Sequence, residues 1–116
     1  IGDANVLEAE IINKHSNLYD IKISEMNIRI KSEKNLNKKI SVALRPEKIL
    51  INRNRTENCI YATIKNASFV GSNYQYILDS NAGKLYLISG DTKDIFKVGE
   101  DVFLNLNKED IKILND

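Results

Sequence analysis

The stretch ISVALRPEKILI, residues 40–51, shows how this chain is built. From Ile40 to Leu44, apolar side chains alternate with small or polar ones, which is the period of a half-buried β-strand. Pro46 ends this strand because proline has no backbone N–H to donate to a neighbouring strand. The apolar alternation resumes at Ile49. We therefore predict a strand, an Arg-Pro-Glu corner and a second strand.

A similar pattern returns near the end of the chain. Aligning Leu44 with Leu106 gives an offset of 106 − 44 = 62, and the same offset places Ile49 on Ile111. The two copies predict two halves, at about residues 1–52 and 58–116, that each close with the same corner. A chance similarity in a chain rich in strands is the alternative.

The rest of the chain is also predicted to form short strands. Residues 80–83, Ser-Asn-Ala-Gly, have the composition of a tight hairpin turn. No stretch has a sustained helical period, so at most single helical turns are expected, at residues 46–48 and 108–110. Short strands at regular spacing indicate an all-β barrel or sandwich. The further strands are expected at residues 5–13, 19–23, 26–31, 60–69, 74–78, 84–89, 102–106 and 111–114.

The overall charge is balanced, with 17 basic and 16 acidic residues. This balance argues against a dedicated nucleic-acid or polyanion binder. Residues 29–55, however, carry nine Lys or Arg and two Glu, a net charge of +7. Two interpretations stay open for this basic stretch: a basic face for an anion or an acidic partner, or the solvated outer faces of strands and a polar loop.

The sequence carries few of the residue patterns that indicate catalysis. Cys59 is the single cysteine, which excludes an internal disulfide, favours a reducing compartment and fits a small core residue. His15 is the single histidine and has no partner at metal-ligand spacing. The tripeptide at residues 82–84, Ala-Gly-Lys, fails as a phosphate loop because positions 78 and 85 are both Leu. We expect no catalytic residue, cofactor or metal site in this chain.

The aromatic residues allow one further hypothesis. Tyr74 and Tyr76 share a strand face at a spacing of two, as in proteins that stack the bases of single-stranded nucleic acids. Aromatic side chains are also common in strands, where they pack across the sheet. The basic stretch lies in the other half of the sequence, so we favour packing.

Four phrases of the sequence resemble one protein family, in the order in which that family has them. The phrases are the opening IGDANVLEAE, the LRPE corner at residues 44–47, FVG followed by YQY at residues 69–76, and VGEDV at residues 98–102. They resemble the TOBE (transport-associated OB) domain of ABC importer ATPases. The Gly-Asp-x-Asn start is most similar to the spermidine/putrescine importers.

The resemblance implies an OB-like β-barrel of the TOBE type, built from two sequence segments and spanning residues 1–116. It implies an ATPase domain before Ile1, which would hold ATP and Mg. It also implies a second copy of the ATPase subunit in a homodimer, membrane permease subunits, and a cytoplasmic location at the inner face of the cell membrane. The role implied for this chain is an accessory and regulatory one in an importer of polyamines.

Five residues are candidates for interfaces. The resemblance places Gly2, Asp3 and Asn5 at the junction with the ATPase domain. Arg45 and Glu47 are expected to form a buried or interfacial ion pair that fixes the corner, with a simple turn as the alternative. The lysine-rich loop at residues 32–39 has no counterpart in the family pattern.

Other functions remain as alternatives to the accessory role. A small-anion or effector-binding OB module would use the basic stretch. A single-stranded nucleic-acid-binding OB protein would use the tyrosines. Direct sensing of a polyamine would need clustered carboxylates, for which the candidates are Asp91, Asp94, Glu100 and Asp101.

Overall fold

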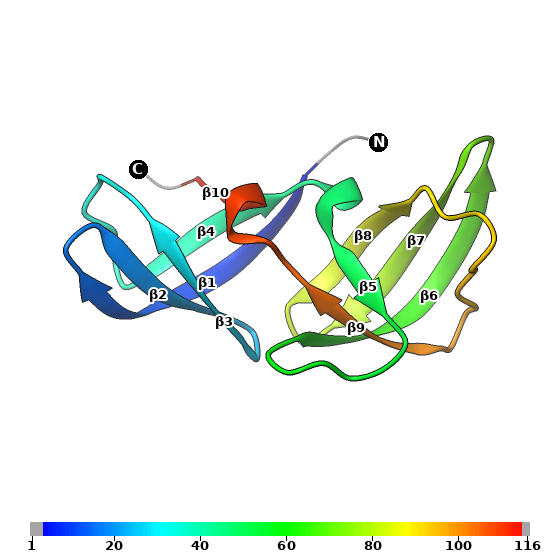
Figure 1. Ribbon diagram of the computed structural model, residues 1–116, viewed down its shortest axis with the longest axis horizontal. Coiled ribbons are helices and arrows are strands. Elements are labelled where there is room, and N and C mark those ends of the chain that lie inside the picture. The colour runs from blue at the N-terminus through cyan, green and yellow to red at the C-terminus, as the bar shows by residue number, and fades with distance from the viewer. Residues whose placement is uncertain (1–3, 115–116) are drawn as a thin grey trace.

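The computed structural model describes residues 4–114 and is built from strands and two short 3₁₀ helices (Figure 1). The predicted strands are all present, and the two helical turns lie at the residues expected for them. The elements are β1 (Asn5–His15), β2 (Leu18–Ile23), β3 (Met26–Lys31), β4 (Lys39–Leu44), η1 (Pro46–Lys48), β5 (Leu50–Asn52), β6 (Ile60–Val70), β7 (Asn73–Ser80), β8 (Gly83–Ser89), β9 (Asp101–Asn105), η2 (Lys108–Asp110) and β10 (Lys112–Ile113).

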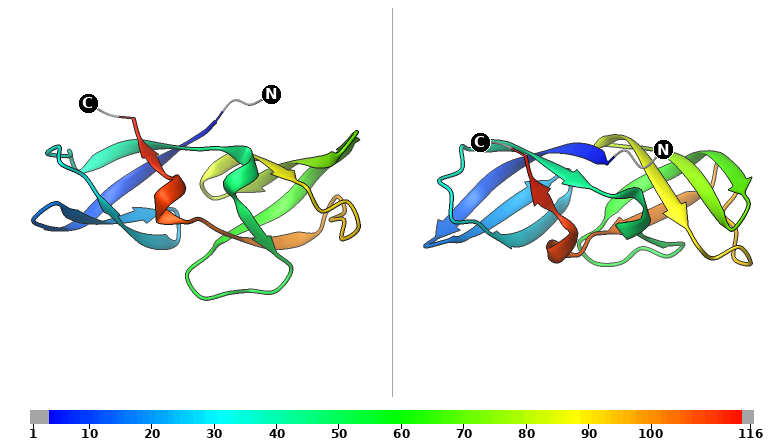
Figure 2. Two further views of the ribbon diagram at one scale, coloured as in Figure 1. Left: turned by 45° about the horizontal axis from the view of Figure 1, so that its top comes forward. Right: turned by 90° about the horizontal axis from the view of Figure 1, so that it is seen from above.

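The strands form two five-stranded sheets whose last strands are exchanged. The first sheet, lobe 1, has the order β10-β4-β1-β2-β3, and the second, lobe 2, has the order β5-β9-β6-β7-β8. All pairs are antiparallel. The lobes lie side by side along the longest axis of a body of 44 × 26 × 19 Å (Figures 1 and 2). Because β5 joins lobe 2 and β10 joins lobe 1, the two sequence halves interlock.

The strand registers of the two lobes correspond to each other. Ala9 pairs with Ile40 in lobe 1, and Ala62 pairs with Val102 in lobe 2, so the first strands correspond at an offset of 53 and the fourth strands at an offset of 62. The β1–β2 ladder shifts register between Ile11 and Asn13, and the β6–β7 ladder shifts between Ile64 and Asn66. Each shift increases the local twist of the strand, which helps its sheet to curl.

The Arg-Pro-Glu corner turns the chain from one lobe to the other. Pro46 is the first residue of η1, where its missing N–H costs no hydrogen bond, and its side chain is buried. The η1 helix contacts β8 of lobe 2, and the equivalent η2 helix contacts β3 of lobe 1. The corner predicted from the sequence is therefore the element through which the lobes exchange their last strands.

Alternating apolar residues of both lobes face inward and form one core. The largest fully buried side chains include Tyr19, Ile21, Ile60, Tyr76 and Leu104. Cys59 is buried, as predicted. The curled sheets and their order give the OB-like all-β fold that the sequence predicted.

The tight turns occur where the sequence predicted them. Ser80 pairs with Gly83, and Gly83 has a φ of +104°, a conformation that costs glycine little. Val70 pairs with Asn73, and Gly71 between them has a φ of +74°. These turns fix the register of the two hairpins in lobe 2.

Candidate functional site

The corner residues Arg45 and Glu47 form the ion pair expected from the sequence. Arg45 Nε lies 2.7 Å from Glu47 Oε2, and the side chains are 65% and 40% exposed. The hydrogen bond from Arg45 lowers the pKa of Glu47, and the same bond raises the pKa of Arg45. The pair is not buried, which corrects the buried form of the prediction: Arg45 precedes η1, Glu47 lies within it, and both side chains are exposed to solvent. Its role at an interface stays a prediction.

Asn5 holds the start of β1 against the edge of lobe 2. Its side-chain Nδ2 donates to the carbonyl oxygen of Tyr86 at 2.8 Å, and its Oδ1 accepts from the Tyr86 N–H at 2.8 Å. Asn5 is 4% exposed and is the buried polar residue of the described chain. Its amide therefore satisfies the two backbone groups of Tyr86 that a neighbouring strand would otherwise bond at the free edge of β8. Gly2 and Asp3 lie outside the described residues, and a contact of Asn5 with a preceding domain stays a prediction.

Asn58 makes the equivalent contact in the opposite direction. The β1–β6 offset of 53 places Asn5 on Asn58. The Asn58 side chain accepts from the Asn27 N–H at 2.7 Å and donates to the Asn27 carbonyl oxygen at 2.6 Å. Asn27 lies on β3, the edge strand of lobe 1. Each lobe thus holds the edge of the other through one asparagine, and we call these two contacts the asparagine clamps.

The basic stretch does not form one basic face. Lobe 1 (residues 5–44 and 107–114) carries nine basic and seven acidic residues, and lobe 2 (residues 45–106) carries eight basic and seven acidic residues. The stretch spans both lobes, and carboxylates from outside it pair with two of its arginines. Among its arginines, Arg29 pairs with Asp20, and Arg55 lies 4.9 Å from the centre of the Phe103 ring. The structure favours the solvated interpretation of this stretch.

Arg53 ties the connector between the halves to the loop before β9. Its guanidinium donates to Glu100 at 2.7 Å, to Asp94 at 2.6 Å and to the Ile95 carbonyl at 2.8 Å. It also lies 4.2 Å from the centre of the Phe96 ring. Two of the four carboxylates considered for polyamine sensing are therefore neutralised within the molecule.

The other two carboxylates of that set are also engaged. Asp91 accepts from the backbone N–H groups of Lys93 and Asp94, and these bonds lower its pKa. Asp101 accepts from the Tyr61 hydroxyl at 2.8 Å. The set forms local turns and pairs, so it offers no cluster of free carboxylates for a cationic ligand.

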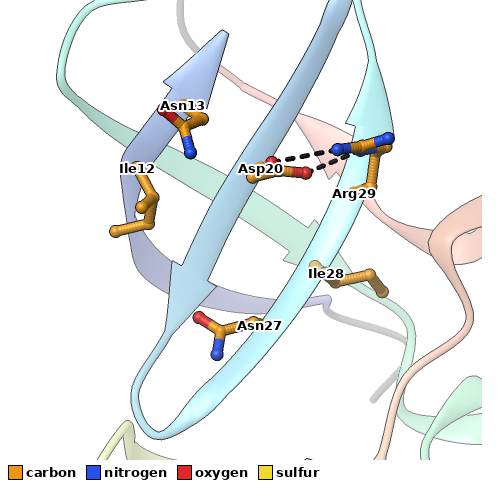
Figure 3. Close-up of a pocket in the computed structure, with 6 residues that line it drawn as sticks. All are labelled: Ile12, Asn13, Asp20, Asn27, Ile28 and Arg29. Carbon is orange, nitrogen blue, oxygen red and sulfur yellow. Dashed lines mark hydrogen bonds and ion pairs between the residues drawn. The ribbon is translucent and has the colours of Figure 1, made fainter. Parts of the chain in front are cut away.

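A shallow groove of about 390 Å³ lies on lobe 1 over β1, β2 and β3 (Figure 3). The Arg29 guanidinium donates to both oxygens of Asp20, at 2.6 and 3.1 Å, and these bonds lower the pKa of Asp20. The guanidinium fork that would bind an anion is therefore occupied by the protein's own carboxylate. The groove is lined by Ile12, Asn13, Asp20, Asn27, Ile28 and Arg29.

The tyrosine pair of β7 belongs mostly to the core. Tyr76 is 1% exposed, and its hydroxyl accepts from the Phe96 N–H at 3.1 Å. Tyr74 stacks on Tyr76 with ring centres 5.9 Å apart, and Phe69 contacts Tyr74 at 5.3 Å. With Tyr76 buried, the pair is not an open platform for bases. Packing, the favoured interpretation, describes it.

The described residues hold no group of three or more His, Cys, Asp or Glu side chains that would suit a metal ion. His15 is exposed and lies 3.9 Å from Asp20, its nearest carboxylate. Within residues 4–114, no helix has the length and apolar character needed to cross a membrane.

Sequence reasoning missed Asn58, Arg53 and Tyr19 as organising residues. Tyr19 of lobe 1 corresponds to Tyr76 of lobe 2. Its hydroxyl donates to the Lys34 carbonyl at 2.8 Å and accepts from the Leu36 N–H at 3.4 Å. The repeat was the available signal, since an offset of 53 pairs the two asparagines and an offset of 57 pairs the two tyrosines.

Two comparisons relate the chain to known proteins at the level of fold and sequence. It is 26% identical over 121 residues to the Fe(3+) ions import ATP-binding protein FbpC of Fusobacterium nucleatum. That match covers 100% of this chain and 31% of the relative, so the chain spans about a third of its length. The cytoplasmic molybdate-binding protein ModG, solved with molybdate bound, shares the fold with a TM-score of 0.75 at 13% identity, over 97% of this chain and 96% of that one.

The family follows from a direct match to its sequence pattern. Residues 42–114 match the model of the TOBE domain, which is more than half of the chain. The matched region begins inside β4 and includes the Arg-Pro-Glu corner, the whole of lobe 2 and β10. Strands β1, β2 and β3 of lobe 1 lie before it. The chain belongs to the TOBE domain family.

Proposed function

We propose that this chain is the C-terminal accessory domain of the ATP-binding subunit of an ABC importer. The observation that carries the proposal is the whole-chain similarity to one third of an import ATP-binding protein. In this proposal the chain contributes to subunit contacts and regulation. Catalysis belongs to a preceding ATPase domain that holds ATP and Mg.

The interlocked lobes suit a regulatory role. Strand exchange and the two asparagine clamps join the lobes at four places, so the domain moves as one body. A rigid body attached to an ATPase biases its opening or closing when its contacts differ between the two states. A coupling of about 1–3 kcal/mol changes the equilibrium roughly 5–150-fold.

The proposed partners follow from the same role. They are the ATPase domain of the same polypeptide, a second ATPase subunit in a homodimer, and permease subunits in the membrane. The complex would place the domain in the cytoplasm, peripheral to the inner face of the cell membrane. No nucleic-acid partner is proposed.

For the cargo we propose a polyamine, spermidine or putrescine, on the basis of the Gly-Asp-x-Asn start alone. The relative named for Fe(3+) makes ferric iron the competing cargo. Uptake of labelled spermidine and of ferric iron by cells that lack this gene, compared with complemented cells, separates the two. Loss of spermidine uptake alone supports the polyamine proposal, and loss of iron uptake alone refutes it.

A second candidate function is the binding of a small oxyanion. It is favoured by the fold shared with a molybdate-binding protein. The arginine pairs of the basic stretch argue against a ready site in a single copy, since Arg29 and Arg45 are already matched by carboxylates. Equilibrium dialysis with molybdate and sulfate tests this candidate.

The accessory-domain proposal itself is tested on the native polypeptide. An antibody raised against this domain is used to purify the polypeptide for intact-mass measurement and an assay of ATP hydrolysis with Mg. This chain has a mass of 13.2 kDa and covers 31% of its relative, so a full-length polypeptide of similar proportions has a mass of about 13.2/0.31 = 43 kDa. A measured mass near that value, together with ATP hydrolysis, supports the proposal. A polypeptide of that size that neither binds nor hydrolyses ATP refutes it.

A further inference from the structure

The β6–β7 hairpin of lobe 2 is longer than its counterpart in lobe 1. Ile11 pairs with Ile21, ten residues later, whereas the equivalent Ile64 pairs with Leu78, fourteen residues later. The four additional residues extend the hairpin beyond the point where the lobe 1 hairpin turns. We call residues 69–74, which form this extension and its turn, the aromatic tip.

In lobe 1 the inner face of the hairpin is covered by the chain itself. The loop at residues 32–38 lies over it, with Leu36 packed on the core and Lys34 and Leu36 bonded to the Tyr19 hydroxyl. A further bond joins the Ile11 N–H to the Lys38 carbonyl at 2.7 Å. In lobe 2 the equivalent loop covers Tyr76 through Phe96, whose N–H bonds to the Tyr76 hydroxyl and whose ring contacts the Tyr76 ring.

The aromatic tip therefore exposes side chains of the kind that normally pack. Phe69 is 57% exposed and Val70 is 48% exposed. Tyr74 connects Phe69 to the buried Tyr76 through two ring contacts, so the exposed ring is held in place by the core. Rigid aromatic side chains of this kind are enriched where proteins bind one another.

Charge limits the kind of partner. Residues 66–78 contain no Lys, Arg, Asp or Glu, in a chain of which 28% is charged. An uncharged surface has no electrostatic attraction for nucleic acid or for anionic lipid. The chemistry of the tip suits an uncharged protein surface.

The position of the tip suggests where that surface comes from. In Figure 1 and in the left view of Figure 2, the β6–β7 tip and the start of the described chain lie on the same, upper side of the molecule. A domain joined before β1 would connect to the chain on that side. The related import protein has about two thirds of its length outside the matched region.

We infer that the aromatic tip is the surface through which this domain packs against the ATP-binding part of the same polypeptide. The inference rests on the function proposed above. Phe69 is its apolar anchor, with Val70 beside it.

The test measures how fast a cysteine at the tip reacts with a maleimide. Val70→Cys is made in the 116-residue chain and in the full-length polypeptide, and labelling at that position is followed by peptide mass spectrometry. Cys59 is buried and provides an internal reference. Ile12→Cys is the matched control, since Ile12 on lobe 1 is 51% exposed and Val70 is 48% exposed.

We expect labelling of Val70→Cys to be at least about tenfold slower in the full-length polypeptide than in the 116-residue chain. A tenfold reduction corresponds to an interface that covers the tip about 90% of the time. Labelling of Ile12→Cys should be equal in both. Adding Phe69→Asp to the full-length Val70→Cys variant should restore fast labelling.

Three results overturn the inference. Equal labelling of Val70→Cys in both polypeptides, with ATP binding intact, overturns it and leaves the proposed function standing. Protection that rises with protein concentration assigns the tip to a second copy instead. A full-length polypeptide that does not bind ATP overturns both the inference and the proposed function.

Discussion

Replacing the buried Asn5 with alanine should destabilise the domain more than replacing the exposed Asn58, which makes the equivalent contact. The Asn5 amide makes two hydrogen bonds of 2.8 Å to the backbone of Tyr86, and these bonds join the first strand of lobe 1 to the edge of lobe 2. Asn5→Ala leaves the Tyr86 N–H without its acceptor and the Tyr86 carbonyl oxygen without its donor. Water has little access to restore them, because Asn5 is 4% exposed.

The magnitude follows from the two bonds and their burial. Each hydrogen bond contributes about 1 kcal/mol net, and an unsatisfied buried group adds to the loss. We expect the free energy of unfolding to fall by about 2–3 kcal/mol. For a domain of this size, that loss lowers the Tm by about 8–12 °C.

The matched control is Asn58→Gly, which removes the equivalent clamp in the opposite direction. Asn58 is exposed and has a φ of +58°, which glycine adopts easily, so water replaces the lost bonds without backbone strain. We expect a loss of about 0.5–1 kcal/mol in this variant. Urea unfolding followed by circular dichroism gives both values. Losses for the two variants that agree within about 0.5 kcal/mol would refute the reasoning.

Asn5→Asp tests the geometry of the clamp through its pH dependence. The new carboxyl group must donate to the Tyr86 carbonyl, as the Asn5 amide does, and it does so only when protonated. Its pKa in the folded state is therefore raised above the unfolded value of about 3.9. The stability that it contributes is present below that pH and is lost as the pH rises. We expect the variant to approach the wild-type stability near pH 4 and to fall below it at pH 7.

Four further outcomes follow from the structure. Tyr76→Phe removes the acceptor of the Phe96 N–H and should cost about 1 kcal/mol, as should Tyr19→Phe at the equivalent position, both measured by urea unfolding. Arg53→Met should lower the Tm at pH 7 more than Arg45→Met, because Arg53 bonds to three groups and Arg45 to one. Bonds from the Lys97 N–H and from Arg53 lower the pKa of Glu100. This carboxylate therefore stabilises the fold above its unfolded pKa, and that stability is lost as the pH falls through its pKa in the folded state. The difference in Tm between Arg53→Met and the wild type should shrink over the same pH range. Spermidine, molybdate and sulfate should leave the Tm of the isolated chain unchanged, since Arg29, Arg45 and Arg53 are each paired with a carboxylate of the same molecule. A shift of several degrees with any of the three ligands would contradict this.

The strands and corners were predictable because they depend on local patterns. The alternation around Leu44 and the proline at position 46 each act within a few residues, and the offset of 62 carried the same prediction to Leu106. Both 3₁₀ helices lie at the predicted turns. Local periodicity and turn chemistry were therefore sufficient for the elements and for the all-β class.

The exchange of the last strands was not predictable from the same patterns. The alternation of Leu50–Asn52 is satisfied by pairing with any apolar strand, and the sequence does not state that the partner is β9. The asparagine clamps are hidden for a different reason. A chain rich in asparagine gives no local sign that Asn5 and Asn58 bond to distant backbone, and only the register of the folded strands reveals it.

The basic stretch shows why charge along a sequence is a weak guide to a site. Two of its arginines meet carboxylates from other parts of the fold: Arg29 meets Asp20 on β2, and Arg53 meets Asp94 in the loop before β9. Those carboxylates lie 9 and 41 residues away in the sequence. The pairing depends on the fold, so the net charge of a stretch overstates the charge of the surface that it forms.

The central claim is that this domain regulates an ATPase to which it is joined. Its most direct test compares Mg-dependent ATP hydrolysis by the full-length polypeptide with hydrolysis by the same polypeptide cut before this domain, both in the presence of the permease subunits. We expect hydrolysis to persist in the shortened protein, with a rate changed by roughly fivefold or more. Equal rates in the two proteins, with the permease bound to both, would contradict it.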